Sequence, residues 1–343
     1  MPDDWQDVAV TGHFAVYEPD RTRLLPEFLH RLIQTRSFKS HLWRNKVGAE
    51  GRKEVKLDFL ESQLIPLPPL SVQRRIVARW HDAQEQIAAA KRRVEDLKTK
   101  SEAEFLKRLG FAFTLSGKLP KVFAVGWQDF GRWSVSFNQQ TCASLNLETG
   151  KYPVVSLDSI LEMVQYGTSE KANTSGDGTL VVRMNNLANG GLNLTNIKHV
   201  KLSPKETDGL RLCDGDILFN RTNSKELVGK CAVFHEPIDC VFASYLIRVR
   251  TQPDQADPDF VVHILNGRIG RQQIDALSRQ IIGQANVNST ELRIPLPPLP
   301  VQRKLVERAT AARAEVARER AASDQLAQSI AAEVETLILG QSS

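Results

Sequence analysis

The chain has 343 residues, a formal net charge of +5, 41% hydrophobic residues and 25% charged residues. This length allows more than one hydrophobic core, so we expect two or more domains of ordinary globular composition. The apolar runs are too short to span a bilayer, and the start of the chain lacks a secretory signal pattern, which favours a cytoplasmic protein without membrane contact. The four cysteines are spaced neither as zinc ligands nor as a disulfide framework, so we expect reduced thiols.

Residues 1–64 predict a partial domain. A strand pattern precedes a helix that is predicted from Pro26 to Ser37, and turns follow it. This stretch has a counterpart later in the chain, because His13–Phe28 aligns without gaps on Tyr245–Phe260. The alignment needs a three-residue adjustment farther on. We interpret residues 1–64 as the C-terminal part of a domain whose complete copy is residues 150–293.

A proline motif, Ile-Pro-Leu-Pro-Pro-Leu, occurs at residues 65–70 and again at 294–299, an offset of 229. Its prolines exclude a helix and favour an extended segment. Each copy continues through Val-Gln-Arg into about thirty residues without Pro or Gly, where apolar residues alternate at spacings of four and three, as in a coiled coil. We therefore expect a proline motif and a long helix in residues 65–110 and again in 294–340. The expected seam residues are Ile76, Trp80, Ala83, Ile87, Ala90, Val94, Leu97, Ser101 and Phe105, then Leu305, Ala309, Ala312, Val316, Glu319, Ser323, Leu326, Ile330 and Val334.

The first long helix also carries most of the net positive charge. Residues 73–108 contain ten basic and six acidic residues. A basic balance permits nucleic-acid binding, although a solvated helix face would show the same count.

Between the two helices, residues 111–149 are interpreted as a connecting segment and residues 150–293 as a β-rich domain. Short apolar runs such as Leu180–Val182 and Ile217–Phe219 are separated by Gly, Asn, Asp and Pro turns. A helix is predicted from about Pro258 to Leu277. The fold class is therefore α+β, a β-rich domain with a helix plus two long helices that form an antiparallel coiled coil.

Motifs of catalysis are nearly absent from the sequence. Val228–Lys230 lacks the upstream glycine of a phosphate loop, and we find no zinc-protease helix, nucleophile elbow or methyl-donor loop. Asp20 with Glu54 and Lys56 is the nearest approach to a nuclease pattern, in which carboxylates would hold magnesium. We expect a chain without catalytic residues, cofactor or metal site, with a magnesium-dependent nuclease as the alternative.

Four polar loops of the β-rich domain hold side chains that suit DNA. Arg reads guanine and Asn or Gln reads adenine through paired hydrogen bonds, whereas Lys, Ser and Thr contact phosphates. Each loop alone also fits an ordinary polar turn, and Arg221 has the alternative of bracing its own turn through Asp214 or Asp216. The candidate DNA-binding residues are Tyr166, Thr168, Ser169, Lys171, Arg183, Asn185, Asn186, Asn220, Arg221, Thr222, Asn223, Lys225, Lys230, Gln284 and Asn286. Among them we expect Arg221 and Asn223 to contact bases, and Lys225 and Lys230 to contact phosphates.

The order of these parts resembles the specificity (S) subunit of type I restriction–modification enzymes. The similarity rests on the duplicated proline motif with its Gln-Arg helix, and it extends over essentially the whole chain. Further similar segments are Tyr166–Thr168, Val182–Asn186, Gly215–Arg221 and Val228–Lys230. The resemblance implies target recognition domains that each read half of a split DNA site, held apart by two antiparallel helices.

The resemblance also implies partners. Double-stranded DNA, methyltransferase (M) subunits and a restriction (R) subunit are expected, with S-adenosylmethionine, ATP and magnesium on those partner subunits and none in this chain. The chain would then be a non-catalytic, sequence-specific subunit in defence against foreign DNA. Compared with that plan, we expect a truncated first recognition domain, with a second S chain or self-association to complete the site. The alternative is a coiled-coil scaffold that binds proteins without DNA specificity.

Overall fold

The computed structural model of the chain describes residues 16–46, 55–111, 122–125, 135, 145–188, 190–221, 228–280 and 292–340, without the side chains of 276–280. The chain divides into unit 1 (Met1–Asp96 and Val316–Ser343) and unit 2 (Leu97–Glu315). The division runs through both long helices. Within the described ranges, the helices are too short or too polar to cross a membrane.

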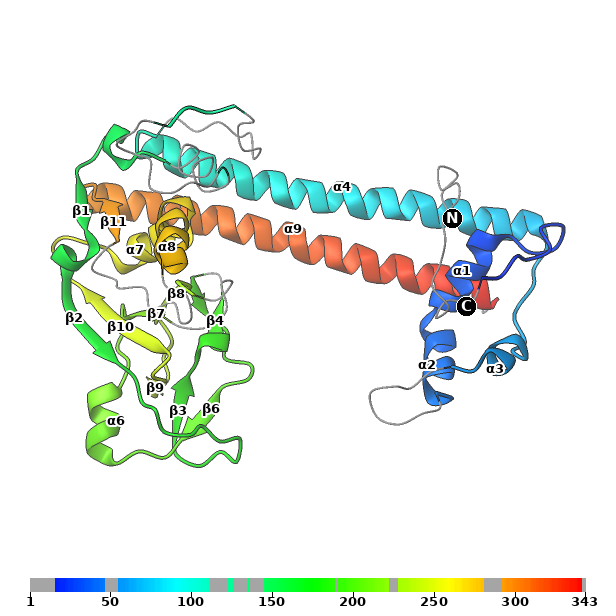
Figure 1. Cartoon of the computed structure of the whole chain (residues 1–343), viewed down its shortest axis with the longest axis horizontal. Coiled ribbons are helices and arrows are strands. Elements are labelled where there is room, and N and C mark those ends of the chain that lie inside the picture. Colours follow the sequence, from blue (N-terminus) through cyan, green and yellow to red (C-terminus); the bar gives the residue numbers. More distant parts are fainter. Residues whose placement is uncertain are drawn as a thin grey trace. The chain divides into compact units, whose positions relative to one another are not determined.

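The two long helices predicted from the duplicated motif are α4 (Leu70–Arg108) and α9 (Leu299–Leu339) (Figure 1). Every predicted seam residue is buried or half-buried, Glu319 included. In unit 1 the start of α4 packs with the end of α9, as Ile76 and Val334 share one apolar cluster. In unit 2 the end of α4 packs with the start of α9. Because opposite ends pair in each unit, the helices are antiparallel, which confirms the predicted fold class.

The described part of unit 1 is otherwise built from three shorter helices. They are α1 (Pro26–Gln34), α2 (Arg36–Arg44) and α3 (Leu57–Glu61). The sequence predicted one helix to Ser37 followed by turns, and this was wrong. Thr35 has an extended backbone with a ψ of 150°, which ends α1, and its Oγ1 accepts a hydrogen bond from the backbone N–H of Phe38 at 3.3 Å. This side-chain cap starts α2 at the next residue.

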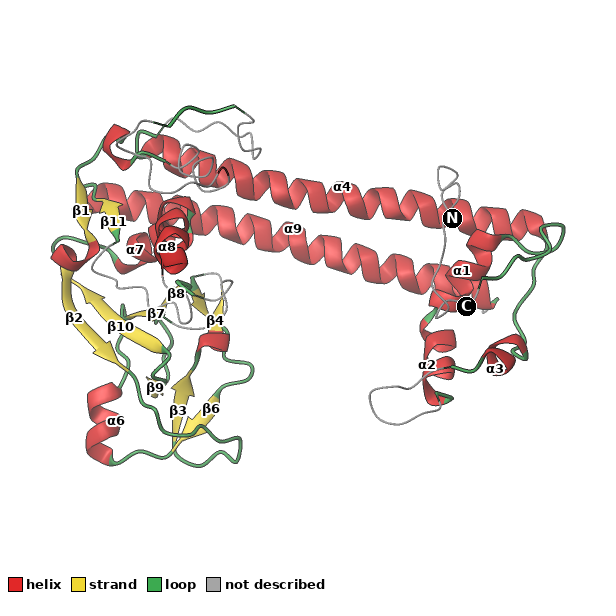
Figure 2. Ribbon diagram, in the orientation of Figure 1, coloured by secondary structure: helices red, strands yellow, loops and turns green. Residues whose placement is uncertain are grey.

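Unit 2 contains the β-rich domain (Figure 2). Its strands are β1 (Val154–Ser156), β2 (Leu161–Tyr166), β3 (Thr179–Val182), β4 (Leu187–Ala188), β5 (Gly191–Leu192), β6 (Lys198–Val200), β7 (Ile217–Asn220), β8 (Cys231–Val233), β9 (Cys240–Phe242), β10 (Leu246–Thr251) and β11 (Arg293–Pro295). Its helices are α6 (Pro204–Leu210), α7 (Pro258–Asn266) and α8 (Arg268–Gln280), with short 3-10 helices at Leu147–Thr149, Leu157–Ile160 and Met184–Asn186. The central sheet has the order β2-β10-β7-β8 and a second sheet has the order β6-β3-β9, while β1-β11 and β4-β5 form pairs.

The apolar runs predicted as strands correspond to β1, β3, β7, β8 and β10, but β2, β4, β5, β6, β9 and β11 were not predicted. β2 alternates between half-buried and exposed residues, and such a short amphipathic run is hard to recognise. The single helix predicted from Pro258 is two helices, since Gly267 has an extended backbone with a ψ of −177° and ends α7. Thr35 of unit 1 and Gly267 are equivalent in the alignment of the two units. Both units therefore interrupt the helix at the same position.

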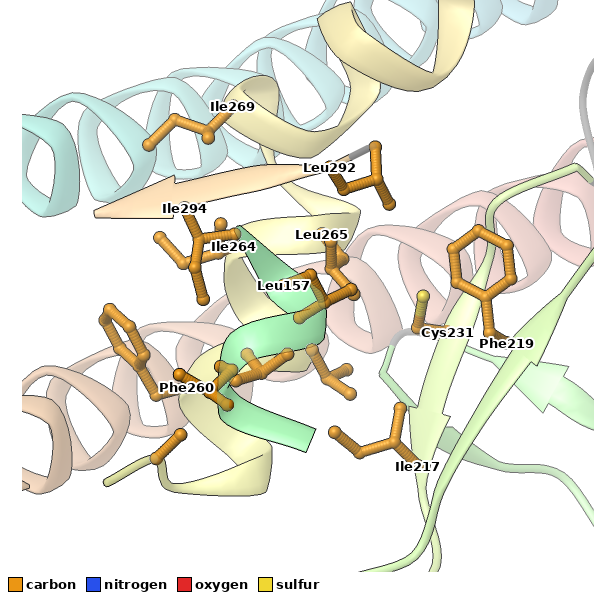
Figure 3. Close-up of a cluster of buried hydrophobic side chains, with 14 of the residues drawn as sticks. Leu157, Ile217, Phe219, Cys231, Phe260, Ile264, Leu265, Ile269, Leu292 and Ile294 are labelled. Carbon is orange, nitrogen blue, oxygen red and sulfur yellow. The ribbon is translucent and has the colours of Figure 1, made fainter. Parts of the chain in front are cut away.

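The core of unit 2 lies between the central sheet and α7 (Figure 3). Ile217, Phe219 and Cys231 come from β7 and β8, and Phe260 and Leu265 come from α7. All of them are buried. Burial raises the pKa of the Cys231 thiol to about 12, so this cysteine is a neutral core residue.

A fully buried glutamine connects the proline motif of unit 1 to the helix pair. The side-chain amide of Gln73 donates to the carbonyl oxygens of Arg23 (2.8 Å) and Pro68 (2.7 Å), and its oxygen accepts from the backbone N–H of Leu25 (2.8 Å). One side chain thereby satisfies three backbone groups at the start of α1 and α4.

The same arrangement recurs in unit 2. Gln302 is also fully buried, and it donates to the carbonyl oxygens of Gln255 (2.8 Å) and Pro297 (2.7 Å) while accepting from the backbone N–H of Asp257 (2.8 Å). The helix partners are offset by 229 residues between the units and the domain partners by 232. The hydrogen bonds of the two glutamines thus show the same three-residue adjustment as the sequence alignment.

The two units also share the composition of the core beside each glutamine. Phe28 of α1 and Phe260 of α7 are equivalent, and both are fully buried. Val334 of α9 packs in the unit 1 cluster, and its counterpart Phe105 of α4 packs in the unit 2 cluster. Each junction therefore combines the start of one long helix, the end of the other and a short helix pair.

Candidate nucleic-acid interface

Several strands of the β-rich domain end at the same edge of the central sheet. β2 and β7 each pair antiparallel with β10, so β2 and β7 run in the same direction. Tyr166 ends β2, Asn220 ends β7, and Tyr245 immediately precedes β10. Residues that follow β2 and β7 and residues that precede β10 are consequently brought together.

The loop after β2 is fixed to the end of β9. Thr168 donates its backbone N–H to the carbonyl oxygen of Phe242 at 2.9 Å, and its carbonyl accepts from the N–H of Ser244 at 2.7 Å. A Cβ atom at Gly167 would lie 2.3 Å from the same Phe242 oxygen, so only glycine allows this close approach. Ser169 and Lys171, which follow, are exposed.

Arg221 lies at the centre of this edge. Its backbone N–H donates to the carbonyl oxygen of Tyr245 at 3.2 Å, and its Nε donates to that of Ser244 at 3.3 Å. The guanidinium carbon is 4.9 Å from the centroid of the Tyr166 ring. The ring is 58% exposed, so the charge is presented beside an accessible aromatic face.

The two carboxylates considered as bracing partners of Arg221 bind other cations. The buried Asp216 accepts from the Arg248 guanidinium at 3.3 Å and is also bonded to Arg250. The Asp214 carboxylate lies 2.7 Å from Nδ1 of His235. The contacts described for these two carboxylates are thus with other residues, while Arg221 itself is bonded to the Ser244 carbonyl.

Two predicted DNA-binding side chains lie inside the domain instead. Asn186 is 2% exposed, and its amide donates to the carbonyl oxygen of Asn193 (2.9 Å) and accepts from the N–H of Arg183 (3.0 Å). Asn220 is fully buried at the end of β7. Arg183 is half-buried and donates to the carbonyl oxygen of Asn196 at 3.0 Å. Asn186 and Arg183 thus bond to the backbone carbonyls of Asn193 and Asn196, and the buried Asn186 and Asn220 side chains lie away from the outer surface.

The remaining candidates fall into two groups. Asn185 is exposed and Lys230 is half-buried beside Gly229, whose φ of 76° favours glycine. The candidates that lie outside the described residues are Thr222, Asn223, Lys225, Gln284 and Asn286.

The sequence prediction missed Tyr245 as a surface residue. Tyr245 is 50% exposed and contributes its carbonyl oxygen to Arg221. The sequence pattern assigned it to the strand, which in fact begins at Leu246. Only the pairing with the ends of β2 and β7 reveals its position.

The nuclease alternative finds little support in the described part of the chain. Both the N–H and the hydroxyl of Thr22 donate to the Asp20 carboxylate, at 3.0 and 2.6 Å, and these bonds lower the pKa of Asp20. Asp20 therefore closes its own turn, and Glu54 lies outside the described residues. Within the described ranges, His, Cys, Asp and Glu form no group of three that could hold a metal ion.

Comparisons with known proteins agree with the resemblance that the sequence indicated. The chain is 26% identical over 283 residues to the type I restriction enzyme EcoKI specificity subunit of Escherichia coli, covering 79% of this chain and 56% of that protein. It is 27% identical over 165 residues to the type I restriction enzyme StySPI specificity subunit of Salmonella potsdam, covering 46% of this chain and 34% of that protein. The chain thus spans about half the length or less of these curated relatives. No protein-family model matches it.

A solved structure shows the same fold. It is described as the structural basis of complex assembly and conformational transition of the type I R-M system. The match covers 93% of this chain and 72% of that chain, with 18% sequence identity and a TM-score of 0.55. The curated relatives thus confirm the similarity to type I specificity subunits that the sequence predicted, and the solved structure shows the fold.

Proposed function

We propose that this chain, which is similar to the specificity subunits of type I restriction enzymes, binds duplex DNA sequence-specifically and acts as such a subunit. The observation that supports this most directly is the edge of the central sheet, where Arg221 lies beside Tyr166 and Tyr245. Side chains held by a rigid sheet lose little conformational entropy on binding, which suits base reading.

The proposed contacts divide by chemistry. Arg221 would read a base in the major groove, because a guanidinium matches the paired acceptors of guanine. Ser169, Lys171, Asn185 and Lys230 would contact the DNA backbone through hydroxyl, ammonium and amide groups. Asn186 and Asn220 are removed from the proposed interface, since both side chains are buried.

The long helices are proposed to bind partner subunits. Small seam residues let the two helices approach each other closely, and exposed positions such as Ala311, Ala321 and Ala322 leave faces for further helices. The partners would be M subunits and an R subunit, which would supply S-adenosylmethionine, ATP and magnesium chemistry, while this chain would have no catalytic role. Loss of co-purification with an M subunit after replacement of exposed residues on α4 and α9 would support this assignment. Retention after deletion of both helices would contradict it.

One sheet edge of this kind occurs in the described residues, and it corresponds to one half of a split DNA site. Reading of the other half by a second S chain, or through self-association, is part of the proposal. Sedimentation of the chain with one-half-site and two-half-site duplexes would distinguish a single bound copy from two.

Gel-shift titration of the full chain over a range of salt concentrations tests DNA binding itself. Lys171→Ala should weaken binding to all sequences alike and reduce the salt slope by about one unit, because one phosphate contact is lost. Lys39→Ala is the matched control, an exposed lysine of unit 1, and should leave the slope unchanged. Binding without sequence preference in the wild type would instead support the alternative of a protein scaffold.

A further inference from the structure

The contact between Tyr166 and Arg221 joins two strand ends that are not neighbours in the sheet. β10 lies between β2 and β7, yet the Arg221 guanidinium carbon approaches the Tyr166 ring to 4.9 Å. The guanidinium is thus held from two sides, by the ring of Tyr166 and by the Ser244 carbonyl that accepts from Nε at 3.3 Å. An arginine side chain is otherwise one of the most flexible, so these contacts select among its rotamers.

The ring itself is attached to a fixed backbone. Tyr166 is paired with Ile247 in the sheet, and the next residue is the glycine that approaches Phe242. The backbone N–H of Thr168 is then bonded to that same Phe242 carbonyl. Because the backbone on both sides of Tyr166 is held, the ring is a fixed surface against which the guanidinium packs.

We propose that Tyr166 is a positioning residue that orients Arg221 to read a guanine in the major groove. This inference rests on the proposed DNA-binding function and assigns the specificity of one base pair to the pair of side chains. An arginine reads guanine through two parallel hydrogen bonds, so discrimination depends on the orientation of the guanidinium plane. A planar aromatic face holds that plane, whereas an aliphatic side chain of similar size does not.

Tyr245 provides a matched control. It is a second exposed tyrosine at the same edge, 50% exposed compared with 58% for Tyr166. It contributes to Arg221 a main-chain carbonyl oxygen, which a leucine variant retains. Tyr245→Leu removes a side chain of the same interface, so any loss of affinity should be the same for all sequences, and the relative preference at the base pair of Arg221 should stay unchanged.

The experiment is selection of the full chain on a duplex DNA library with randomised central positions, followed by sequencing of the bound fraction. Wild type, Tyr166→Phe, Tyr166→Leu, Tyr245→Leu, Arg221→Lys and the double variant Tyr166→Leu/Arg221→Lys are compared after circular dichroism has shown that each is folded. Wild type and Tyr166→Phe should share a preference for guanine at one position. Tyr166→Leu should lower that preference about two- to fivefold. Arg221→Lys should lower it about fivefold or more at the same position. The double variant should equal Arg221→Lys alone, because the tyrosine acts through the arginine.

The inference is overturned if Tyr166→Leu keeps the full preference, lowers all positions alike, or changes a position that Arg221→Lys leaves intact. A wild-type chain that enriches no sequence at all would overturn the proposed function, and this inference with it. If the wild-type chain enriches a motif but Arg221→Lys relaxes the preference at a position without guanine, the inference is overturned and the proposed function is not.

Discussion

Both units of this protein contain the same junction, in which a short helix pair packs against the start of one long helix and the end of the other. In unit 2 the β-rich domain also packs against this junction. In both, a buried glutamine after the proline motif bonds to three backbone groups, at nearly identical distances. α7 of unit 2 buries five apolar residues, whereas its counterpart α1 buries only Phe28 and Leu32. The difference arises because α7 is also covered by the β-rich domain. The junction therefore forms with or without the sheet beside it, as far as the described residues show.

This comparison separates the residues that build the junction from those that dock the sheet. Phe28 and Phe260 are fully buried in both contexts, so they belong to the junction. Val261 and Val262 of α7 are buried, while their counterparts Leu29 and His30 of α1 are half-buried and exposed. Burial at these two positions therefore depends on contact with the sheet.

The largest expected loss of stability comes from replacing the phenylalanine that both junctions share. Phe28→Ala and Phe260→Ala should each lower the free energy of unfolding by about 3–5 kcal/mol, since each leaves a cavity in a fully packed core. Urea denaturation followed by circular dichroism measures the change. Leu64→Ala, at a residue that is 98% exposed, serves as the control and should have little effect. A cost near zero for Phe28→Ala would show that the two junctions are not energetically equivalent.

The second test is the glutamine pair. Gln73→Ala and Gln302→Ala each remove the partner of three backbone groups that are at least partly buried, so each should cost about 2–3 kcal/mol of unfolding free energy. Arg74→Ala and Arg303→Ala change the exposed neighbours of these glutamines and provide controls in the same urea titration. If the two variants lose clearly different amounts of unfolding free energy, the hydrogen bonds of the two glutamines are not energetically equivalent.

The third test asks whether DNA reading is confined to unit 2. Arg221→Ala should cost about 1–3 kcal/mol of specific binding and relax the preference at one base pair, with no loss of stability of that size. Lys39→Ala on α2 of unit 1 should leave the preference unchanged. Fluorescence anisotropy with the selected duplex and a scrambled one gives both quantities. If Arg221→Ala mainly lowers the melting temperature and specific binding survives in the folded fraction, the arginine braces its turn.

A smaller contrast is expected in the pH dependence of stability. His263 of α7 lies against the Phe105 ring and accepts a bond from Arg313; burial, and then the Arg313 charge, lower its pKa to about 3. The unfolded chain binds the proton near pH 6.5 and the folded chain does not, so stability should fall as pH drops below about 6.5. His263→Gln should remove that part of the slope. The unit 1 counterpart is Arg31, which stays charged throughout this range and gives no such slope. Urea midpoints at about pH 7.5 and about pH 5 provide the measurement.

The smallest expected effect is a pH dependence of stability at His235, opposite in direction to that at His263. His235 lies between the carboxylates of Asp214 (2.7 Å) and Asp259 (2.9 Å). Burial by itself lowers the pKa of His235, but the hydrogen bonds to both carboxylates outweigh it and raise the pKa above its ordinary value. The stabilisation should be full below about pH 6.5 and should disappear as pH rises through the raised pKa. His235→Asn should flatten this change in the same urea titration. A variant that instead loses stability equally at every pH would show that packing, and not charge, is what His235 contributes.

Local and periodic features of the fold were predictable. The proline motif, the seams of both long helices and their antiparallel pairing follow from a pattern that repeats at an offset of 229 residues. Such a pattern specifies which face of a helix is apolar, whatever the rest of the chain does. The breaks at Thr35 and Gly267 were missed because each depends on a single residue with an extended backbone inside a helical pattern.

The composition of the candidate interface was decided by tertiary structure. From the sequence, Asn186 and Asn220 are as suitable for DNA as Asn185, and Tyr245 is an ordinary strand residue. Strand pairing buries the first two and places Tyr166, Arg221 and Tyr245 at one edge, although up to 79 positions separate them in the chain. Local sequence determines the type of side chain in each loop, but the direction in which it points is set by hydrogen bonds to strands that are distant in sequence.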